Sequence, residues 1–173
     1  MRINNNIRHL ILFVTLVLMQ VLFLDNINIH GTLNPFIYPL FILLLPLNSA
    51  HWQTIIAGFL IGIVIDIFES SPGIHAASSV FLGFIRPFIL NLIKPKGGYK
   101  DDSSPSIKEL GLLWFIIYFS VSIFLHHIVL FFTEIASLNN ISYTIAKIIL
   151  SSMFSILFSI LTLYLFSFNS TKK

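Results

Sequence analysis

Long apolar runs separated by short charged connections are the feature that most constrains this chain. Six runs can be marked, at 10–24, 35–47, 52–68, 74–93, 110–132 and 145–168. A helix needs about 20 apolar residues to cross the roughly 30 Å of hydrocarbon in a bilayer. Because 56% of the 173 residues are hydrophobic and only 10% are charged, a water-soluble surface cannot be built from this chain. We therefore predict an all-α membrane protein whose main solvent is lipid.

The second run, at 35–47, is the weakest of the six. Its 13 residues include Pro39 and Pro46. As a helix they would span only about 20 Å, at about 1.5 Å per residue. The run must recruit its neighbours, tilt, or thin the bilayer, and a re-entrant segment is the alternative.

Positive charge favours six transmembrane helices, because Lys and Arg in short loops prefer the cytoplasmic side. With the N-terminus inside, six crossings leave only Lys147 outside, since Arg86 lies within a run. Removing the second crossing would export the lysine-rich linker at 94–109. We expect a multi-pass protein of a bacterial inner membrane with both termini cytoplasmic. Residues 1–173 would form one integral membrane domain.

Composition and motifs argue against catalysis and nucleic-acid binding. The net charge is +3, but the basic residues lie in short connections rather than on one amphipathic face. The absence of cysteine excludes disulfides, thiolate metal sites and cysteine nucleophiles. No phosphate-binding loop, G-x-S-x-G, H-E-x-x-H or glycine-rich dinucleotide motif occurs, and no acid and base pair lies at one depth. We expect neither an enzyme nor a cofactor.

Small residues follow one face of the third run. Thr54, Gly58, Gly62 and Asp66 recur at steps of four, and Gly58 with Gly62 forms a G-x-x-x-G pair. Helices in lipid gain little from hydrophobic burial against each other, so small residues usually mark faces of close backbone approach. We expect helix packing at Gly58 and Gly62, and lining of a ligand cavity is the alternative.

Asp66 is the only carboxylate in the interior of a run. An ionisable residue inside a membrane span is a functional hypothesis by default. The competing interpretation is an interfacial aspartate that accepts hydrogen bonds from the following turn, which contains Pro72 and Gly73. This turn would let the third and fourth runs pack as a hairpin.

The fourth run carries a second small-residue stripe that includes Gly83 and ends at Arg86. Arg86 lies about 15 Å from the depth of Asp66, at about 1.5 Å per residue, which is too far for a salt bridge. We expect its guanidinium to reach toward the cytoplasm or to pair with a carbonyl freed by Pro87. A buried polar contact with a partner is the alternative.

The last two runs contain histidines and regularly spaced serines. His126 and His127 point about 100° apart on a helix, which is poor geometry for one metal ion, so we expect no metal site. We place both histidines near the outer boundary of the membrane. Ser151, Ser155 and Ser159 recur at steps of four and predict a further contact face between helices.

Several short motifs, taken in order, resemble the MreD family of rod-shape proteins. They are N-P-F-I-Y-P at 34–39, the stripe of Gly58, Gly62 and Asp66, P-G-I-H-A at 72–76, and Arg86 followed by Pro87. The match covers most of the first 93 residues, and the last two runs agree in hydropathy.

The resemblance implies a non-enzymatic inner-membrane subunit of the cell-elongation complex. Such a subunit binds the single-span protein MreC and, through it, glycan polymerase, transpeptidase and actin-like filament partners that organise peptidoglycan synthesis and cell shape. The resemblance also implies a six-helix fold similar to the substrate-binding subunits of energy-coupling-factor transporters. A small-molecule-binding subunit of a vitamin transporter is the alternative function, and it needs a cavity lined by convergent polar groups. The spare contact faces also allow a homodimer.

Overall fold

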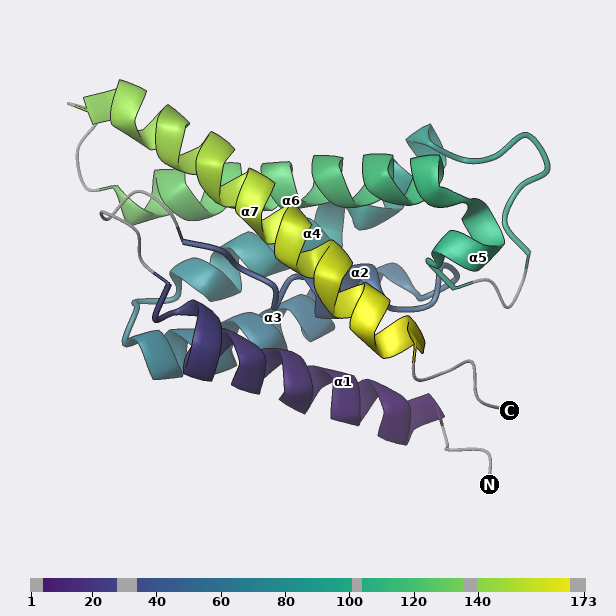
Figure 1. Cartoon of the computed structure of the whole chain (residues 1–173), viewed down its shortest axis with the longest axis horizontal. Coiled ribbons are helices and arrows are strands. Elements are labelled where there is room, and N and C mark those ends of the chain that lie inside the picture. Colours follow the sequence, from purple (N-terminus) through teal and green to yellow (C-terminus); the bar gives the residue numbers. More distant parts are fainter. Residues whose placement is uncertain (1–4, 28–33, 101–103, 136–139, 169–173) are drawn as a thin grey trace.

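The computed structural model describes residues 5–27, 34–100, 104–135 and 140–168. Within these ranges the chain is helical and contains no strand, which confirms the all-α prediction. The elements are α1 (Asn5–Met19), the π-helix η1 (Gln20–Leu24), α2 (Leu40–Leu43), α3 (His51–Glu69), α4 (Ile74–Leu92), α5 (Ile107–Leu110), α6 (Leu112–Glu134) and α7 (Ile141–Phe168) (Figure 1). Five helical stretches are long and apolar enough to cross a membrane, formed by α1 with η1, α3, α4, α6 and α7. This fits a multi-pass membrane protein.

The hairpin between α3 and α4 turns on two residues with left-handed backbone. Helix α3 ends where Ser70 adopts a φ of 54°, and α4 begins after Gly73, whose φ is 87°. Glycine has no Cβ and adopts this conformation at little cost. Pro72 lies exposed between them and cannot continue the helix. The chain therefore reverses within a few residues.

Helices α3 and α4 pack backbone against backbone. A Cβ added at Gly62 would lie 2.5 Å from the Cα of Ala76, closer than real Cβ atoms approach. A Cβ at Gly58 or at Gly83 would likewise overlap backbone atoms of the facing helix. The glycines thus occupy positions where even one methyl group has no room, as in the close helix contacts of membrane proteins.

The helix directions require the chain to return through the bundle between α1 and α3. Asp25, which follows η1, neighbours Glu69 at the end of α3, so these two helices run in the same direction. The remaining long helices alternate in direction, and a salt bridge of 2.9 Å between Lys147 and Glu134 joins the start of α7 to the end of α6 (Figure 1). A connection from α1 to α3 must therefore travel back along the bundle.

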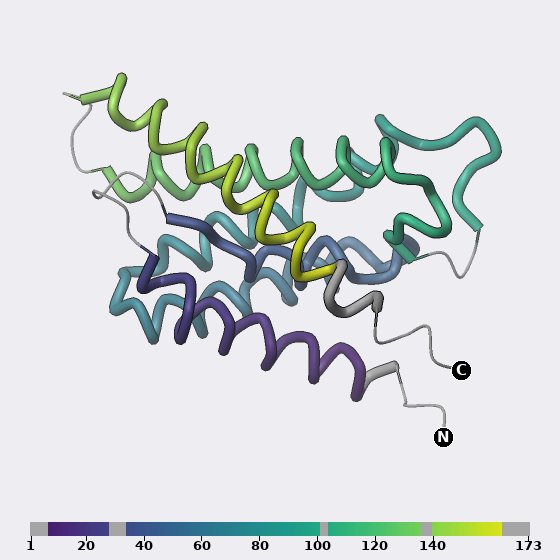
Figure 2. The backbone as a smooth tube through the Cα atoms, viewed as in Figure 1, coloured from purple at the N-terminus to yellow at the C-terminus, as the bar shows by residue number. Residues whose placement is uncertain are grey.

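Residues 34–47, called here the return segment, make this passage. Figure 2 shows them in blue, running from the end of the bundle where α1 stops toward the end where α3 begins. Its first residues are extended, and the only helix in it is the four-residue α2. Helix α2 starts after Pro39 and stops before Pro46, because proline lacks the N–H that a helix interior needs. The run predicted at 35–47 therefore does not form a helix of span length.

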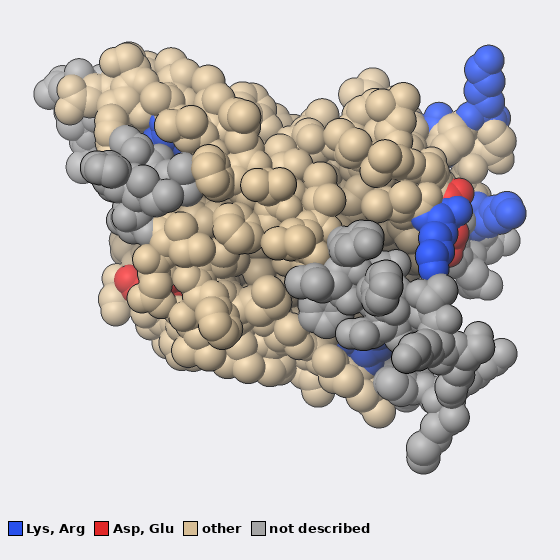
Figure 3. All heavy atoms as spheres, viewed as in Figure 1, with Lys and Arg blue, Asp and Glu red and all other residues tan. Residues whose placement is uncertain are grey.

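The two ends of the bundle differ in charge. The acidic end carries Asp25, Glu69 and Glu134, and the basic end carries the exposed linker residues Lys94, Lys96 and Lys108. Figure 3 shows most visible lysine and arginine atoms at the basic end, with an almost uncharged face between the ends. Large apolar side chains are exposed on this middle zone, as Met153 in the middle of α7 is at 62%. Such exposure is expected where lipid is the solvent.

The linker contains more structure than its composition predicts. Its glycines, prolines and serines are typical of a loop, yet it ends in the short helix α5. Ser106 caps this helix by accepting a hydrogen bond of 3.2 Å from the backbone N–H of Glu109. Serine is a preferred N-cap because its hydroxyl satisfies one of the free N–H groups of the first turn.

The close contact at Gly62 predicts that Gly62→Ala destabilises the protein by about 1 to 3 kcal/mol, because the added methyl group must push α4 away. Unfolding in a mixed detergent titration measures the change. Gly97→Ala is the matched control, since nothing lies within 4 Å of its added Cβ. Equal stability of the two variants would contradict the backbone contact between α3 and α4.

Candidate functional site

The extended part of the return segment obtains its hydrogen bonds from side chains on distant helices. The N–H of Phe36 donates to Ser155 Oγ at 2.8 Å, and the N–H of Ile37 donates to Gln20 Oε1 at 2.8 Å. Gln20 Nε2 in turn donates to the carbonyl of Pro35 at 3.2 Å. The side-chain amide of one glutamine therefore bonds to the return segment as the backbone of a neighbouring β-strand would. Its oxygen accepts one hydrogen bond and its nitrogen donates another.

Gln20 is placed by the π-helix that ends the first membrane helix. The N–H of Asp25 donates to the carbonyl of Gln20 five residues earlier, which is the π-helical pattern. The Gln20 side chain is fully buried, and its Nε2 also donates to Asp25 Oδ1 at 2.7 Å. The sequence analysis missed this residue. Its signal was a lone amide inside an otherwise apolar run.

Ser155 accepts the hydrogen bond from Phe36 and forms a second one with a histidine. Its Oγ lies 3.0 Å from His127 Nε2, and His127 Nδ1 lies 2.8 Å from the carbonyl of Ile123. A carbonyl can only accept, so Nδ1 carries the proton of a neutral imidazole and Nε2 accepts from the serine hydroxyl. Each donor therefore has an acceptor in this series of hydrogen bonds, which runs from the N–H of Phe36 to the carbonyl of Ile123.

The serine stripe on α7 faces this region. Ser151 Oγ accepts a hydrogen bond of 3.1 Å from the N–H of Asn34. Ser155 bonds as described above, and the buried Ser159 hydroxyl has no hydrogen-bond partner among the described residues. The stripe was predicted as a contact face between helices, and two of its three members contact the extended backbone of the return segment as well.

Arg86 holds the other half of the return segment. Its side chain is only 1% exposed. Nη2 donates to the carbonyls of Leu45 and Pro46, and Nε donates to the hydroxyl of Tyr118 at 2.9 Å. The Tyr118 hydroxyl then donates to the carbonyl of Leu43 at 3.2 Å. One guanidinium and one phenol therefore donate hydrogen bonds to three carbonyls at and just after the end of α2. No further helical turn follows α2 to supply donors for these carbonyls.

The carbonyl freed by Pro87 has a different partner from the one predicted. Pro87 has no N–H, so the carbonyl of Gly83 loses its usual donor four residues later. Thr54 Oγ1 donates to that carbonyl at 2.9 Å. The prediction that Arg86 pairs with this carbonyl is wrong, because its side chain is bonded to the return segment.

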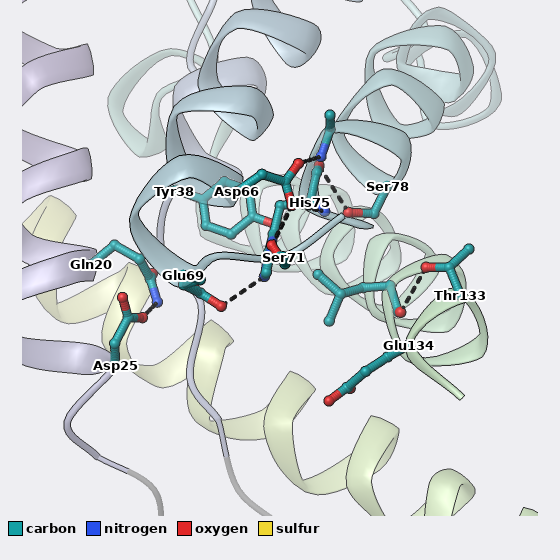
Figure 4. A network of polar contacts seen from close by, with 12 residues as sticks. Gln20, Asp25, Tyr38, Asp66, Glu69, Ser71, His75, Ser78, Thr133 and Glu134 are labelled. Atoms are coloured by element: carbon teal, nitrogen blue, oxygen red, sulfur yellow. Dashed lines mark hydrogen bonds and ion pairs between the residues drawn. The ribbon is translucent and has the colours of Figure 1, made fainter. Parts of the chain in front are cut away.

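Asp66 caps helix α4 from across the hairpin. Oδ1 accepts from the backbone N–H of His75 at 3.0 Å and Oδ2 accepts from that of Ala76 at 2.8 Å (Figure 4). The hydroxyl of Ser71 also donates to Oδ1. The N-cap residue of α4 is Gly73, which has no side chain to supply these acceptors. The carboxylate of α3 replaces it, and its charge suits the positive end of the helix dipole.

Further titratable groups gather around Asp66 at the acidic end. The two ring nitrogens of His75 lie 3.1 Å from Asp66 Oδ1 and 3.2 Å from Glu69 Oε2. The carboxyl of Asp25 neighbours that of Glu69 (Figure 4). Burial raises the pKa of the Asp25 carboxyl, and the hydrogen bond from Gln20 opposes this rise. The cluster therefore joins the end of η1 to the α3–α4 hairpin.

His126 and His127, which the sequence predicts near the outer boundary of the membrane, lie in the interior of the bundle. Both side chains are completely buried, His126 beside Tyr38 and His127 beside Ser155. His126 Nε2 and the Tyr38 hydroxyl share a hydrogen bond of 3.0 Å. Among the residues that the structure describes, no group of three potential ligands is arranged to hold a metal ion.

Two hollows lie between α6 and α7. One of about 170 Å³ lies at the acidic end, beside Glu134 and Lys147. The other, of about 330 Å³, is an open apolar groove that includes Phe124 and Met153. Pockets for drug-sized ligands measure about 300 to 1,000 Å³ and bring several polar groups together. The first cavity is smaller than this range, and the second is a groove on the apolar surface.

Comparison with protein-family models, curated proteins and solved structures finds no match for the chain. The geometry itself shows polar side chains that bind backbone groups: Gln20, Asp66, Arg86, Tyr118 and Ser155 each bond to at least one N–H or carbonyl. Their common role is to hold non-helical backbone and helix ends inside the bundle.

The two aspartates at the acidic end should respond differently to replacement by asparagine. Asp66→Asn removes the charge and one of two acceptors of buried N–H groups, so it should destabilise the protein by about 1 to 3 kcal/mol. Asp25→Asn should cause no loss at neutral pH. The stabilising contribution of protonated Asp25 is complete below the ordinary pKa of 3.8 and is lost as the pH rises through its raised pKa. An amide avoids that loss.

Thermal unfolding of both variants in detergent at pH 7 measures the difference. If Asp25→Asn lost as much stability as Asp66→Asn, the hydrogen bonds from the start of α4 to Asp66 would not be a specific source of stability.

Proposed function

We propose that this protein is a non-enzymatic subunit of the cell-elongation complex of a bacterial inner membrane, similar to the MreD family. One observation supports this most. The motifs that carry the resemblance are spread over residues 34–87, yet they belong to one connected structure. The 34–39 motif begins the return segment, the glycines pack the α3–α4 hairpin, Asp66 caps α4, and Arg86 binds the end of the return segment.

The proposed fold has six membrane crossings, with the return segment as the second. With this number of crossings, both termini and the 94–109 linker lie on the same side of the membrane. We assign that side to the cytoplasm, because Lys94, Lys96 and Lys108 lie exposed at the basic end. Lys147, the basic residue at the opposite end, is paired with Glu134. A single lysine on that side is outnumbered by the lysines at the basic end, so the Lys and Arg bias supports the same direction of insertion.

The proposed role is to bind the single transmembrane helix of MreC and to position it among glycan polymerase, transpeptidase and filament partners. The exposed apolar surface favours contact through the membrane, as do loops too short to form a soluble domain. Polar groups that an enzyme would need for chemistry are instead bonded to backbone, as Asp66 and Arg86 are. A partner helix needs an apolar surface to pack on, and the open apolar groove beside Phe124 and Met153 offers one.

Depletion of the protein in its own cells tests the proposal. Loss of an elongation subunit should turn rods into spheres in rich medium, because side-wall synthesis loses its organisation. Re-expression of the wild type or of Gly97→Ala should restore rods, whereas Gly62→Leu should fail, since its side chain cannot fit against α4.

The transporter alternative gives a different phenotype. A binding subunit for a vitamin would leave cell shape normal and would slow growth only when the nutrient is scarce. Rod-shaped cells after complete depletion, together with a vitamin-dependent growth defect, would overturn the elongation proposal.

A further inference from the structure

His75 lies between two carboxylates at the acidic end. Its Nδ1 is 3.1 Å from Asp66 Oδ1, and its Nε2 is 3.2 Å from Glu69 Oε2 (Figure 4). The two ring nitrogens point away from each other, so each can face its own carboxylate. A carboxylate oxygen only accepts hydrogen bonds, so each of these contacts needs a proton. A neutral imidazole supplies only one.

The contacts of Ser71 show that Nδ1 of His75 carries a proton. The Ser71 hydroxyl donates its single proton to Asp66 Oδ1, and its oxygen lies 3.0 Å from His75 Nδ1. Asp66 uses both of its oxygens as acceptors for the backbone N–H groups of His75 and Ala76, as an ionised carboxylate does. Nδ1 therefore faces two acceptors, the serine oxygen and the aspartate oxygen, and it must be the donor to them.

The contact between Nε2 of His75 and Glu69 then needs a second proton. With its proton on Nδ1, a neutral ring presents a lone pair at Nε2, and an ionised Glu69 presents another at Oε2. A proton on either atom turns this repulsive contact into a hydrogen bond. The pair is then an imidazolium with a carboxylate, or an imidazole with a carboxylic acid. Both states hold one proton more than a neutral histidine and an ionised glutamate.

The surroundings of the pair favour a bound proton. The second oxygen of Glu69, Oε1, is buried and has no hydrogen-bond donor among the described residues. The carboxyl of Asp25 lies within hydrogen-bonding reach of Glu69, and a like charge this close opposes ionisation. Lys147 is paired with Glu134 and does not offset these carboxylates.

The neighbouring elements place few cations near the pair. The titratable and charged groups around it are Asp25 after η1, Asp66 on α3, Glu134 and His126 on α6, Lys147 on α7, and Tyr38 in the return segment. Three of these six groups are carboxyls. Their negative charge stabilises a proton held between His75 and Glu69.

We propose that His75 and Glu69 bind one proton between them at neutral pH, and that this proton holds the end of α3 to the start of α4. Loss of the proton sets the Glu69 carboxylate against the lone pair of Nε2 and against Asp25. The stability that the bound proton contributes therefore falls as the pH rises. In the proposed orientation this end faces away from the cytoplasm, but neither the proton nor its loss depends on that orientation.

Nitrogen-15 NMR of the histidine rings tests the bound proton in the full-length wild type in lipid nanodiscs. Ring shifts distinguish an imidazolium, an Nδ1–H ring and an Nε2–H ring. His127 is the internal reference for a neutral Nδ1–H ring, because its Nδ1 faces a carbonyl and its Nε2 faces Ser155. At neutral pH we expect His75 to be an imidazolium, or an Nδ1–H ring whose Nε2 accepts a hydrogen bond. An Nε2–H ring would overturn the proposal, because it needs no second proton, and so would an Nδ1–H ring whose Nε2 accepts no hydrogen bond.

Thermal unfolding from neutral to alkaline pH tests what the proton does. Glu69→Gln keeps the shape of the side chain but has no carboxyl to titrate, so its melting temperature should fall less than half as much as that of the wild type. Glu109→Gln is the matched control, because Glu109 is an exposed carboxyl on α5 at the other end of the bundle, and it should follow the wild type. An equal fall in the wild type and in Glu69→Gln would show that the proton does not hold the two helices together.

Discussion

Unpaired backbone polar groups cannot remain in hydrocarbon, and the architecture of this protein follows from that constraint. The return segment passes through the bundle with extended residues and a single four-residue helix, so its internal hydrogen bonds leave N–H and carbonyl groups at both of its ends without a partner from the segment itself. Ser155 and Gln20 serve its first part, and Arg86 with Tyr118 serves its last part. Four helices thereby contribute to one hydrogen-bonding shell around a fifth stretch of chain.

The α3–α4 hairpin provides the rigid body against which this shell is built. Gly62 and its neighbours bring the two backbones into contact, and Asp66 locks the turn by capping α4. Arg86 extends from the same hairpin to the carbonyls of Leu45 and Pro46. A buried arginine without a carboxylate partner is costly, but bonds to carbonyls and a phenol compensate its lost hydration in part. The hairpin is thus both a packing unit and a source of donors.

Features that depend on neighbours in sequence could be predicted, and features that depend on distant partners could not. Spacing of four predicted that Gly58 and Gly62 share a face, and two prolines flagged the second run as too short for an ordinary helix. The partners of Arg86 and the serine partner of His127 lie more than 25 residues away in the chain, so no local pattern could reveal them. Gln20 was missed for the same reason, because its role appears only when the return segment lies beside it.

Residue-resolved hydrogen–deuterium exchange in lipid nanodiscs tests the central claim that side chains satisfy the return segment. The claim predicts slow exchange at the amides of Phe36 and Ile37, although neither belongs to a helix. Gln20→Leu should then speed exchange at Ile37 while leaving amides in the middle of α6 protected. Exchange of Phe36 and Ile37 in the wild type as fast as that of Gly97 in the linker would contradict the account.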